Sequence, residues 1–186
     1  MFFFIPDVRF ATGIATYELK TKIMKEEFLQ RIDENQGIIH KISILYARSN
    51  REREDLVQEI ILQLWKSFPQ FKGNAKFSTW MYRVAINTAL MNHREKSFDL
   101  NQAEDLTGNR PISSNPFMET DNKDVISLYI AIDHLSPINK AIILLYLDDE
   151  SYEEIADIMG MNVSNVGVRI SRIKKQLKKI MEYENI

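Results

Sequence analysis

The side chains best suited to binding chemistry lie near the C-terminal end of the chain, where cations collect without matching anions. Residues 158–181 contain six Lys and Arg residues and no Asp or Glu, although the whole chain has a formal net charge of −2. Ammonium and guanidinium groups pair with phosphate oxygens, and Asn or Arg side chains can also form paired hydrogen bonds with base edges. This composition therefore indicates a nucleic-acid-binding face.

The apolar residues of the same stretch determine which way its polar side chains face. Val166, Ile170, Ile173, Leu177 and Ile180 recur in alternating steps of four and three, which predicts a helix from about residue 164 with one buried face. The polar residues expected to contact DNA from the neighbouring face are Ser164, Asn165, Arg169, Arg172, Lys174, Lys175 and Lys178. Among them, Asn165 and Arg169 are candidates for base edges, and the three lysines are candidates for phosphates.

The residues before this helix have the spacing of a helix-turn-helix. Ser151 and Glu154 form a capping box, in which each side chain accepts a hydrogen bond from the other residue's backbone N–H. Ala156 allows close helix crossing, Gly160 can adopt a left-handed turn, and Val166 can bury between the two helices. A basic run on an isolated helix is usually only a solvated face. The ordered combination seen in this sequence favours DNA binding instead.

Length and composition set the remaining limits. The chain has 186 residues, 45% hydrophobic and 27% charged, which suits one globular domain or two small ones. It contains no cysteine, so disulfides, thiolate nucleophiles and Cys-ligated metals are excluded, and we expect a cytoplasmic protein. The apolar start at residues 1–6 is too short to span a membrane and lacks the basic region of an export signal.

The order of hydrophobic patterns predicts an all-α chain of two small helical domains joined by a flexible acidic linker. Residues 1–23 show no helical period, and we expect an N-terminal extension that is either disordered or an artefact of a start site that truly lies at Met24. The first domain is expected over 24–96, with a buried helix face formed by Val57, Ile60, Ile61, Leu64 and Phe68. Ser78 is the expected N-cap of the next helix, which runs to about Arg94.

The linker and the second domain follow from a change in composition. Residues 97–122 carry Gly, Pro, Ser and Asn, with six acidic against two basic residues through Ser127, which predicts the flexible linker. Residues 123–186 are expected to form the second domain. In it, Ser136 and Pro137 supply an N-cap and a first-turn proline for a short apolar helix ahead of the helix-turn-helix.

Motifs in both domains resemble one protein family. Three segments resemble the second region of the extracytoplasmic-function (ECF) RNA polymerase sigma factors. They are residues 55–59 (Asp-Leu-Val-Gln-Glu), 71–83 (Phe-Lys-Gly-Asn-Ala-Lys-Phe-Ser-Thr-Trp-Met-Tyr-Arg) and 84–90 (Val-Ala-Ile-Asn-Thr-Ala-Leu). Leu135-Ser-Pro and the helix-turn-helix resemble their fourth region. The resemblance covers about residues 24–181 in the family's order.

The resemblance implies a non-enzymatic protein that takes RNA polymerase to promoters. Its first domain would bind a coiled coil of the polymerase largest subunit and melt the −10 element, and its second would bind the −35 element and the polymerase flap. The implied polymerase-binding residues are Asp55, Gln58 and Glu59. The implied −10 residues, which capture a flipped base or line the strand path, are Phe71, Lys76, Phe77, Ser78, Thr79, Trp80, Arg83, Asn87 and Arg94, with Tyr82 beside them. An anti-sigma protein, in many members membrane-bound, is also implied.

The sequence departs from the family pattern at one position, and two alternative functions also have to be weighed. Many members have an acidic residue four positions after the Asn that corresponds to Asn87. This chain has Met91 at that position, so its −10 sequence preference stays open. A one-component regulator would also end in a helix-turn-helix, but the motifs of the first domain argue against that alternative. Catalysis is disfavoured because His40, His93 and His134 have no paired-ligand spacing and no phosphate-binding loop is present. We therefore expect no metal, cofactor or small-molecule substrate.

Overall fold

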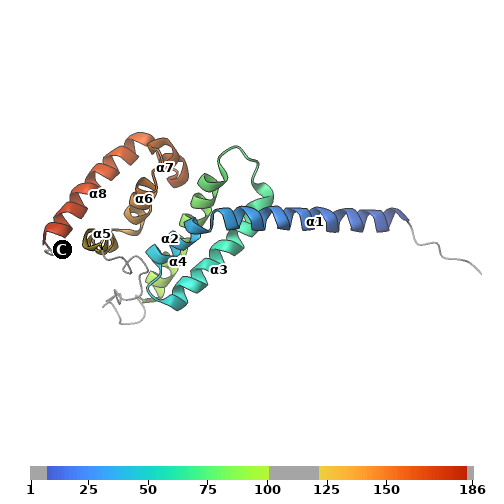
Figure 1. Ribbon diagram of the computed structural model, residues 1–186, viewed down its shortest axis with the longest axis horizontal. Coiled ribbons are helices and arrows are strands. Elements are labelled where there is room, and N and C mark those ends of the chain that lie inside the picture. The colour runs from blue at the N-terminus through green and yellow to red at the C-terminus, as the bar shows by residue number, and fades with distance from the viewer. Residues whose placement is uncertain (1–7, 101–121, 184–186) are drawn as a thin grey trace, which may run out of the picture. The chain divides into compact units, whose positions relative to one another are not determined.

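A computed structural model describes the backbone of residues 8–100 and 122–183 and the side chains of residues 18–95 and 122–183. Every regular element within these residues is a helix, as predicted (Figure 1). In chain order the helices are α1 (Val8–Glu34), α2 (Gln36–Tyr46), α3 (Asn50–Ser67), the 3-10 turn η1 (Phe68–Gln70), α4 (Phe77–Leu100), α5 (Lys123–Asp133), α6 (Pro137–Leu147), α7 (Tyr152–Met159) and α8 (Val163–Tyr183). The predicted linker falls mainly on residues 101–121, outside the described residues. The chain divides into two compact units, Met1–Gln36 and Gly37–Ile186.

Helix α1 extends into the residues that the sequence predicted to be an N-terminal extension. It begins at Val8, so residues 8–23 are helical although their sequence shows no helical period. The side chains of residues 18–23 are all exposed, including Leu19 and Ile23 at 59% and 55%. Exposed helical positions need no apolar period, and Ala, Glu, Leu and Lys are good helix formers.

Helices α2, α3 and α4 form the core of the first domain. Ser49 caps α3 by accepting a hydrogen bond from the N–H of Glu52 at 3.2 Å, and α3 packs along α4. The fully buried side chains of this core include Ile42, Ile60, Leu64, Met81 and Ile86. Each such side chain contributes roughly 1.5–3 kcal/mol by leaving water.

The predicted buried face of α3 was correct in part. Ile60, Leu64 and Phe68 are buried, but Leu56 takes the place expected for Val57, and Ile61 is 36% exposed. The buried stripe therefore repeats in steps of four along one side of the helix. Val57 and Ile61, which widened the predicted stripe, lie beside it and are not fully buried.

Helix α4 differs from its prediction at both ends. The N–H of Trp80 donates to the Lys76 carbonyl at 3.1 Å, and the helix starts at Phe77, so Ser78 lies inside the first turn and is not the N-cap. At the other end the helix continues past Arg94 to Leu100, into the expected linker.

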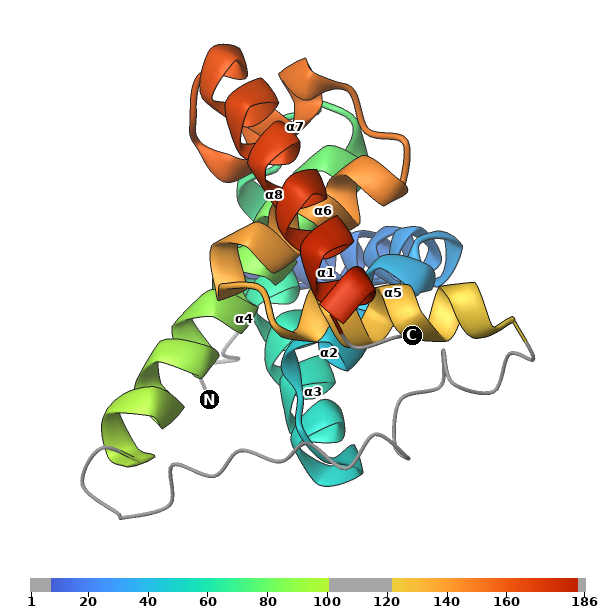
Figure 2. The same ribbon diagram turned by 90° about the vertical axis from the view of Figure 1, so that its left-hand side faces the viewer.

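The second domain consists of α5 to α8. Asn122 caps α5 by accepting from the N–H of Asp124, and Ser136 caps α6 with Pro137 in its first turn, as predicted. Helix α8 packs on α5, α6 and α7, an arrangement that is clear in Figure 2. The fully buried side chains at this junction are Ile142, Leu145, Ile155, Val166, Ile170 and Ile173.

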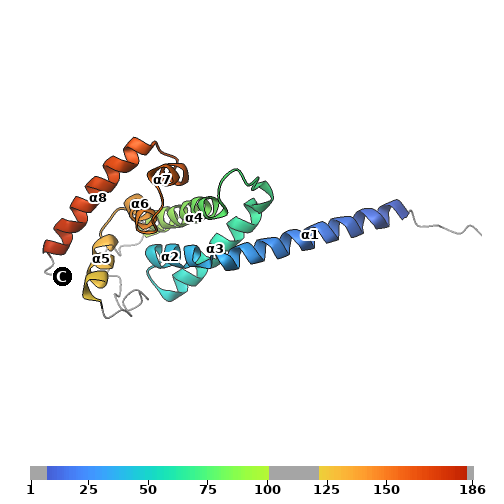
Figure 3. The ribbon, with the colours of Figure 1, turned by 45° about the horizontal axis from the view of Figure 1, so that its top comes forward.

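Within the unit Gly37–Ile186, the two domains also contact each other. Helix α4 of the first domain packs against α6 and α7 of the second (Figure 3). No helix among the described residues has the length and apolar character needed to cross a bilayer.

Candidate nucleic-acid interface

The capping box opens α7 as the sequence predicted. The Ser151 hydroxyl accepts a hydrogen bond from the N–H of Glu154 at 3.2 Å, and the N–H of Ser151 donates to Glu154 Oε2 at 3.0 Å. Two backbone donors at the helix N-terminus are thereby satisfied, and a cap of this type is worth about 1 kcal/mol. The start of the helix-turn-helix is thus capped by hydrogen bonds between neighbouring residues.

The turn between α7 and α8 depends on a glycine. Gly160 has φ of 62°, and its N–H donates to the carbonyl of Ala156, which is itself buried. The second helix then begins at Val163, one residue earlier than predicted, because Asn162 Oδ1 accepts the N–H of Asn165 at 2.8 Å. This Asx cap is visible in the sequence as an Asn directly before the first residue of the basic helix.

Helix α8 has the two faces that its sequence predicted. Val166, Ile170, Ile173 and Leu177 are buried, and Ile180 is half-buried. The predicted DNA-contacting residues are all exposed: Ser164, Asn165, Arg169, Arg172, Lys174, Lys175 and Lys178. We refer to these seven residues as the basic face of α8.

Two members of the basic face are held by α6. Arg169 Nη1 donates to Asn139 Oδ1 at 3.3 Å, a contact that leaves most of the guanidinium available. Lys174 is more strongly engaged: its Nζ donates to the hydroxyl of Tyr146 at 2.6 Å and lies 4.0 Å from the centre of that ring. The structure therefore turns Lys174 toward α6, away from the role of a freely projecting phosphate ligand.

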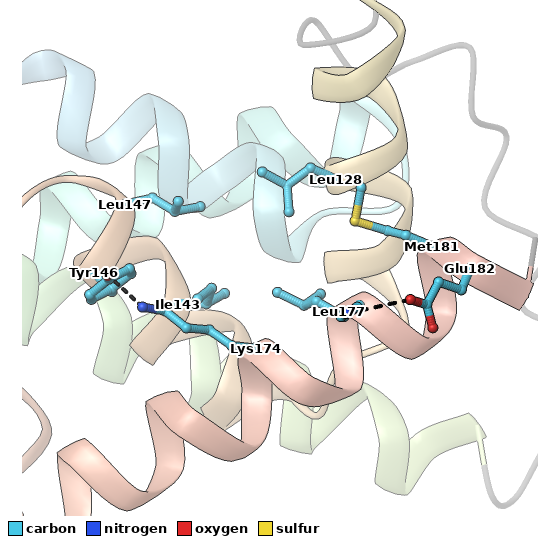
Figure 4. A pocket seen from close by; sticks show the side chains of 9 residues that line it. Leu128, Ile143, Tyr146, Leu147, Lys174, Leu177, Met181 and Glu182 are labelled. Atoms are coloured by element: carbon cyan, nitrogen blue, oxygen red, sulfur yellow. Dashed lines mark hydrogen bonds and ion pairs between the residues drawn. The ribbon is translucent and has the colours of Figure 1, made fainter. Parts of the chain in front are cut away.

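An apolar groove of about 660 Å³ lies beside Lys174 (Figure 4). The residues that line it come from α5, α6 and α8 and are Leu128, Ile143, Tyr146, Leu147, Lys174, Leu177, Lys178, Met181 and Glu182. Six of these residues are apolar or aromatic, and the charged ones are Lys174, Lys178 and Glu182, of which the last two form an ion pair at 3.7 Å. The arrangement suits an amphipathic helix whose apolar side enters the groove.

The loop before α4 is held by an aromatic cluster. The ring centres of Phe71 and Phe77 lie 5.1 Å and 5.2 Å from that of Trp80, and Phe68 lies 6.3 Å from both Phe77 and Trp80. These tilted and edge contacts are favourable beyond simple burial. Phe71, Phe77 and Trp80 are only half-buried, so the cluster both fixes the loop and shows one side to solvent.

The remaining predicted −10 residues divide by exposure. Lys76, Asn87 and Arg94 are exposed, and Ser78 and Arg83 are partly exposed. Thr79 and Tyr82 are each only 4% exposed, so their side chains belong to the packed side of α4 and do not line a strand path. Polar type and spacing could not distinguish Thr79 from Ser78, because both fall in the first helical turn.

The exposed cations of this surface meet acidic residues of α7. Lys76 Nζ lies 2.8 Å from Glu154 Oε1, and Arg83 Nη2 lies 2.6 Å from Asp157 Oδ1. Hydrogen bonding from Lys76, supplemented by the Ser151 N–H and hydroxyl, lowers the pKa of Glu154 to about 2. The same contact with Glu154 raises the pKa of Lys76. Both groups are therefore charged over the whole physiological range.

The predicted polymerase-binding residues lie together on α3. Asp55 and Gln58 are exposed, and Glu59 is partly exposed and accepts a hydrogen bond from Gln63 at 2.7 Å. Asp55 and Glu59 are one turn apart and share a face. The structure thus presents an acidic patch that is available to a basic partner.

Asp148 is a residue that the sequence reading missed as a contact. It ends α6, where it pairs with Lys41 of α2 and accepts a hydrogen bond from the hydroxyl of Tyr82 on α4. Burial and this hydrogen bond raise the pKa of Tyr82. No local signal could have revealed the contact, because Lys41 and Asp148 are 107 positions apart.

Comparisons with known proteins agree with this arrangement. Family models match residues 31–98 (sigma-70 region 2) and 127–177 (sigma-70, region 4). The chain is 31% identical to the ECF RNA polymerase sigma-E factor of Escherichia coli strain K12, covering 74% of this chain and 79% of that protein. It is 26% identical to the ECF RNA polymerase sigma factor SigW of Bacillus subtilis strain 168, over 83% and 89%.

Two solved structures share the fold. The sigma factor RpoE of Bartonella quintana, in complex with the anti-sigma factor NepR, matches with a TM-score of 0.68 at 21% identity, over 87% of this chain and 98% of that one. CnrH, in complex with the cytosolic domain of CnrY, matches with a TM-score of 0.60 at 17% identity, over 86% and 90%.

Proposed function

Because this chain belongs to the ECF group of RNA polymerase sigma factors, we propose that it binds core polymerase, recognises the −10 and −35 promoter elements and promotes melting. Region 2 corresponds to the first domain, and region 4 corresponds to the second. The protein acts by binding and carries out no catalytic step of its own. It works in the cytoplasm, where the polymerase is.

The −35 element is read by the basic face of α8. The N-terminal residues of a second helix in a helix-turn-helix enter the major groove, which assigns Asn165 and Arg169 to base edges. Arg172, Lys175 and Lys178 fix the register through phosphates. The exposed positions of these residues, opposite the buried stripe, are the observation that carries the proposal most directly.

The −10 strand is held by the loop before α4 and by the first turns of that helix. Lys76 and Arg83 supply charge for its phosphates, and the solvent-facing side of the Phe71, Phe77 and Trp80 cluster supplies a stacking surface. Stacking on aromatic rings offsets part of the few kcal/mol that unstacking a base costs. Asn87 and Arg94 extend the same surface along α4.

Core polymerase is bound at two places. Asp55, Gln58 and Glu59 on α3 face the coiled coil of the largest subunit, where Arg and Lys would pair with the two acids. The apolar groove between α5, α6 and α8 receives the helical flap of the polymerase. Two modest contacts on one tethered chain raise the effective concentration of each DNA-reading surface at the promoter.

An anti-sigma protein is the further partner that we propose. The two structural neighbours were both solved in complex with a second protein, the anti-sigma factor NepR in one and the cytosolic domain of CnrY in the other. Such a partner would cover the acidic patch of α3 and the apolar groove, and so exclude the polymerase. Anchoring in a membrane would place that partner under the control of an external signal.

The decisive experiment is run-off transcription with core polymerase, the purified chain and a library of random promoter sequences. Sequencing the transcripts should give discrete start sites preceded by a shared two-part motif. If no initiation occurred while DNA binding persisted without polymerase, the one-component regulator would be the better description.

The polymerase contact has its own test. The double substitution Asp55→Arg and Glu59→Arg should weaken competition for core polymerase by about tenfold or more, because two attractive pairs become repulsive. Glu54→Arg, an exposed neighbour on the same helix, is the matched control. Equal competition by the double variant and this control would remove the acidic patch from the interface.

A further inference from the structure

We propose that Val168 on α8 contacts the C5-methyl group of a thymine in the −35 element, and so adds an apolar contact to the polar readout by Asn165 and Arg169. The inference rests on the proposed role of the basic face of α8 in binding that element. Val168 is not a member of the basic face, because its side chain has no hydrogen-bonding group. Its contribution is a preference for one base pair at one position of the element.

Val168 is an apolar residue on the solvent side of α8. It is 49% exposed, whereas Val166 and Ile170, two positions before and after it, are buried. Two residues of an α-helix correspond to a rotation of about 200°, so Val168 lies opposite the buried stripe. Single exposed apolar residues are common on protein surfaces and need no functional explanation by themselves. The argument for a role therefore depends on the neighbours of Val168.

The neighbours of Val168 on this side of α8 include three residues of the basic face. Asn165 lies three positions before it and Arg172 four positions after it, so these exposed polar side chains flank Val168 along the helix. Ser164 lies four positions before it and Ser171 three positions after it, and both are exposed. Serine side chains are too short to cover the two methyl groups of a valine. When this face enters the major groove, it brings those methyl groups to the base edges together with the polar residues.

The major groove offers one matching partner for such a group. Every base pair displays hydrogen-bonding groups there, and thymine alone adds a methyl group. Contact between that methyl group and Val168 removes apolar surface of both molecules from water, whereas a cytosine offers an amino group and no methyl group. Valine in a helix has one strongly preferred χ1 rotamer, so its methyl groups are held in place before DNA binds. Burial of one methyl group corresponds to roughly fourfold in affinity.

The base preference can be measured by run-off transcription with core polymerase, the full chain and an active promoter whose −35 element is randomised. The wild type should prefer thymine over cytosine at one position, on either strand. Val168→Ser should reduce that preference by about fourfold and leave the other positions unchanged. Val168→Thr keeps one of the two methyl groups and should keep part of the preference. The matched control is Val163→Ser, because Val163 is 39% exposed on the same helix but lies about 140° around its axis from Val168.

A change of a single methyl group on the DNA completes the test. Replacing the preferred thymine by deoxyuridine removes the C5-methyl group and keeps every hydrogen-bonding group of the base pair. The affinity of the complex of core polymerase with the wild-type chain, measured by fluorescence anisotropy on a promoter fragment, should fall about fourfold. With Val168→Ser the same replacement should have no effect, and with Val163→Ser it should cost as much as with the wild type. Circular dichroism confirms that each variant is folded.

The outcomes separate this inference from the proposed function. An equal cost of removing the methyl group for the wild type and Val168→Ser would overturn the contact, and so would a wild-type −35 motif without a thymine preference at any position. In both cases transcription from a two-part motif would still support the sigma-factor function. Failure of the wild-type chain to initiate in the run-off assay would instead reject that function, and the inference with it.

Discussion

The two surfaces proposed to bind DNA use the same kinds of side chain but hold them differently. On α8 the basic face projects from a rigid helix whose opposite side is buried, and most of its cations are exposed without an acidic partner on another helix. At the start of α4 the cations lie beside a half-buried aromatic cluster, and Lys76 and Arg83 are paired with acids of α7. The difference teaches that the cations on α8 are held by one helix alone, whereas two cations beside α4 are also held by ion pairs with another helix.

The largest expected effect comes from a substitution on the basic face of α8. Arg169→Glu should lower the affinity of the free chain for a duplex carrying its −35 element by about 1–3 kcal/mol, or roughly five- to 150-fold, because a base contact is replaced by a repelling carboxylate. Arg83→Glu should change that affinity much less, because Arg83 is already engaged by Asp157. Fluorescence anisotropy measures both. A similar loss in the two variants would show that the surfaces are equally accessible.

A smaller effect concerns the turn that presents α8. Gly160→Ala should reduce the free energy of unfolding by about 1 kcal/mol, because a Cβ is strained at φ of 62° even though the space around it is open. Gly73, in the loop before α4, has φ of 72° and equally open surroundings, so Gly73→Ala should cost a similar amount. Urea unfolding measures the free energy of unfolding of both variants.

The matched control for the turn is Gly37, which lies in α2 with open space around it and no left-handed φ. Gly37→Ala should be neutral or stabilising by up to about 1 kcal/mol, because Ala is the better helix former. If Gly160→Ala were as stable as Gly37→Ala, the left-handed turn would not limit the helix-turn-helix.

The smallest expected effect is a pH dependence at the ion pair between Lys76 and Glu154. Because Lys76 and Ser151 lower the pKa of Glu154 from 4.5 to about 2, its ionised form stabilises the folded chain fully above about pH 4.5. That contribution is lost as the pH falls from about 4.5 toward 2. Glu154→Gln should remove this component from the pH profile of unfolding, whereas Glu153→Gln should leave the profile unchanged. Identical profiles for the two variants would mean that Glu154 is not specifically held.

Sequence signals between neighbouring residues predicted much of the fold and the basic face of α8. The capping box at Ser151, the turn at Gly160 and the apolar stripe of α8 are each defined within a few residues, and each was predicted correctly. The errors arose where a local signal was ambiguous. Ser78 has the side chain of an N-cap but lies inside the first turn, and residues 8–23 are helical although their sequence shows no helical period.

The sequence by itself determined an all-helical chain with a helix-turn-helix and a family resemblance that spans both domains. Hydrophobic periods, caps and turn residues act over one or two helical turns, so they can be read from neighbouring positions. Only the tertiary structure decided that Thr79 is buried, that Lys174 turns toward Tyr146 and that Asp148 joins Lys41 and Tyr82. Those outcomes depend on which helix faces approach one another, and residues up to 107 positions apart set them through packing and charge.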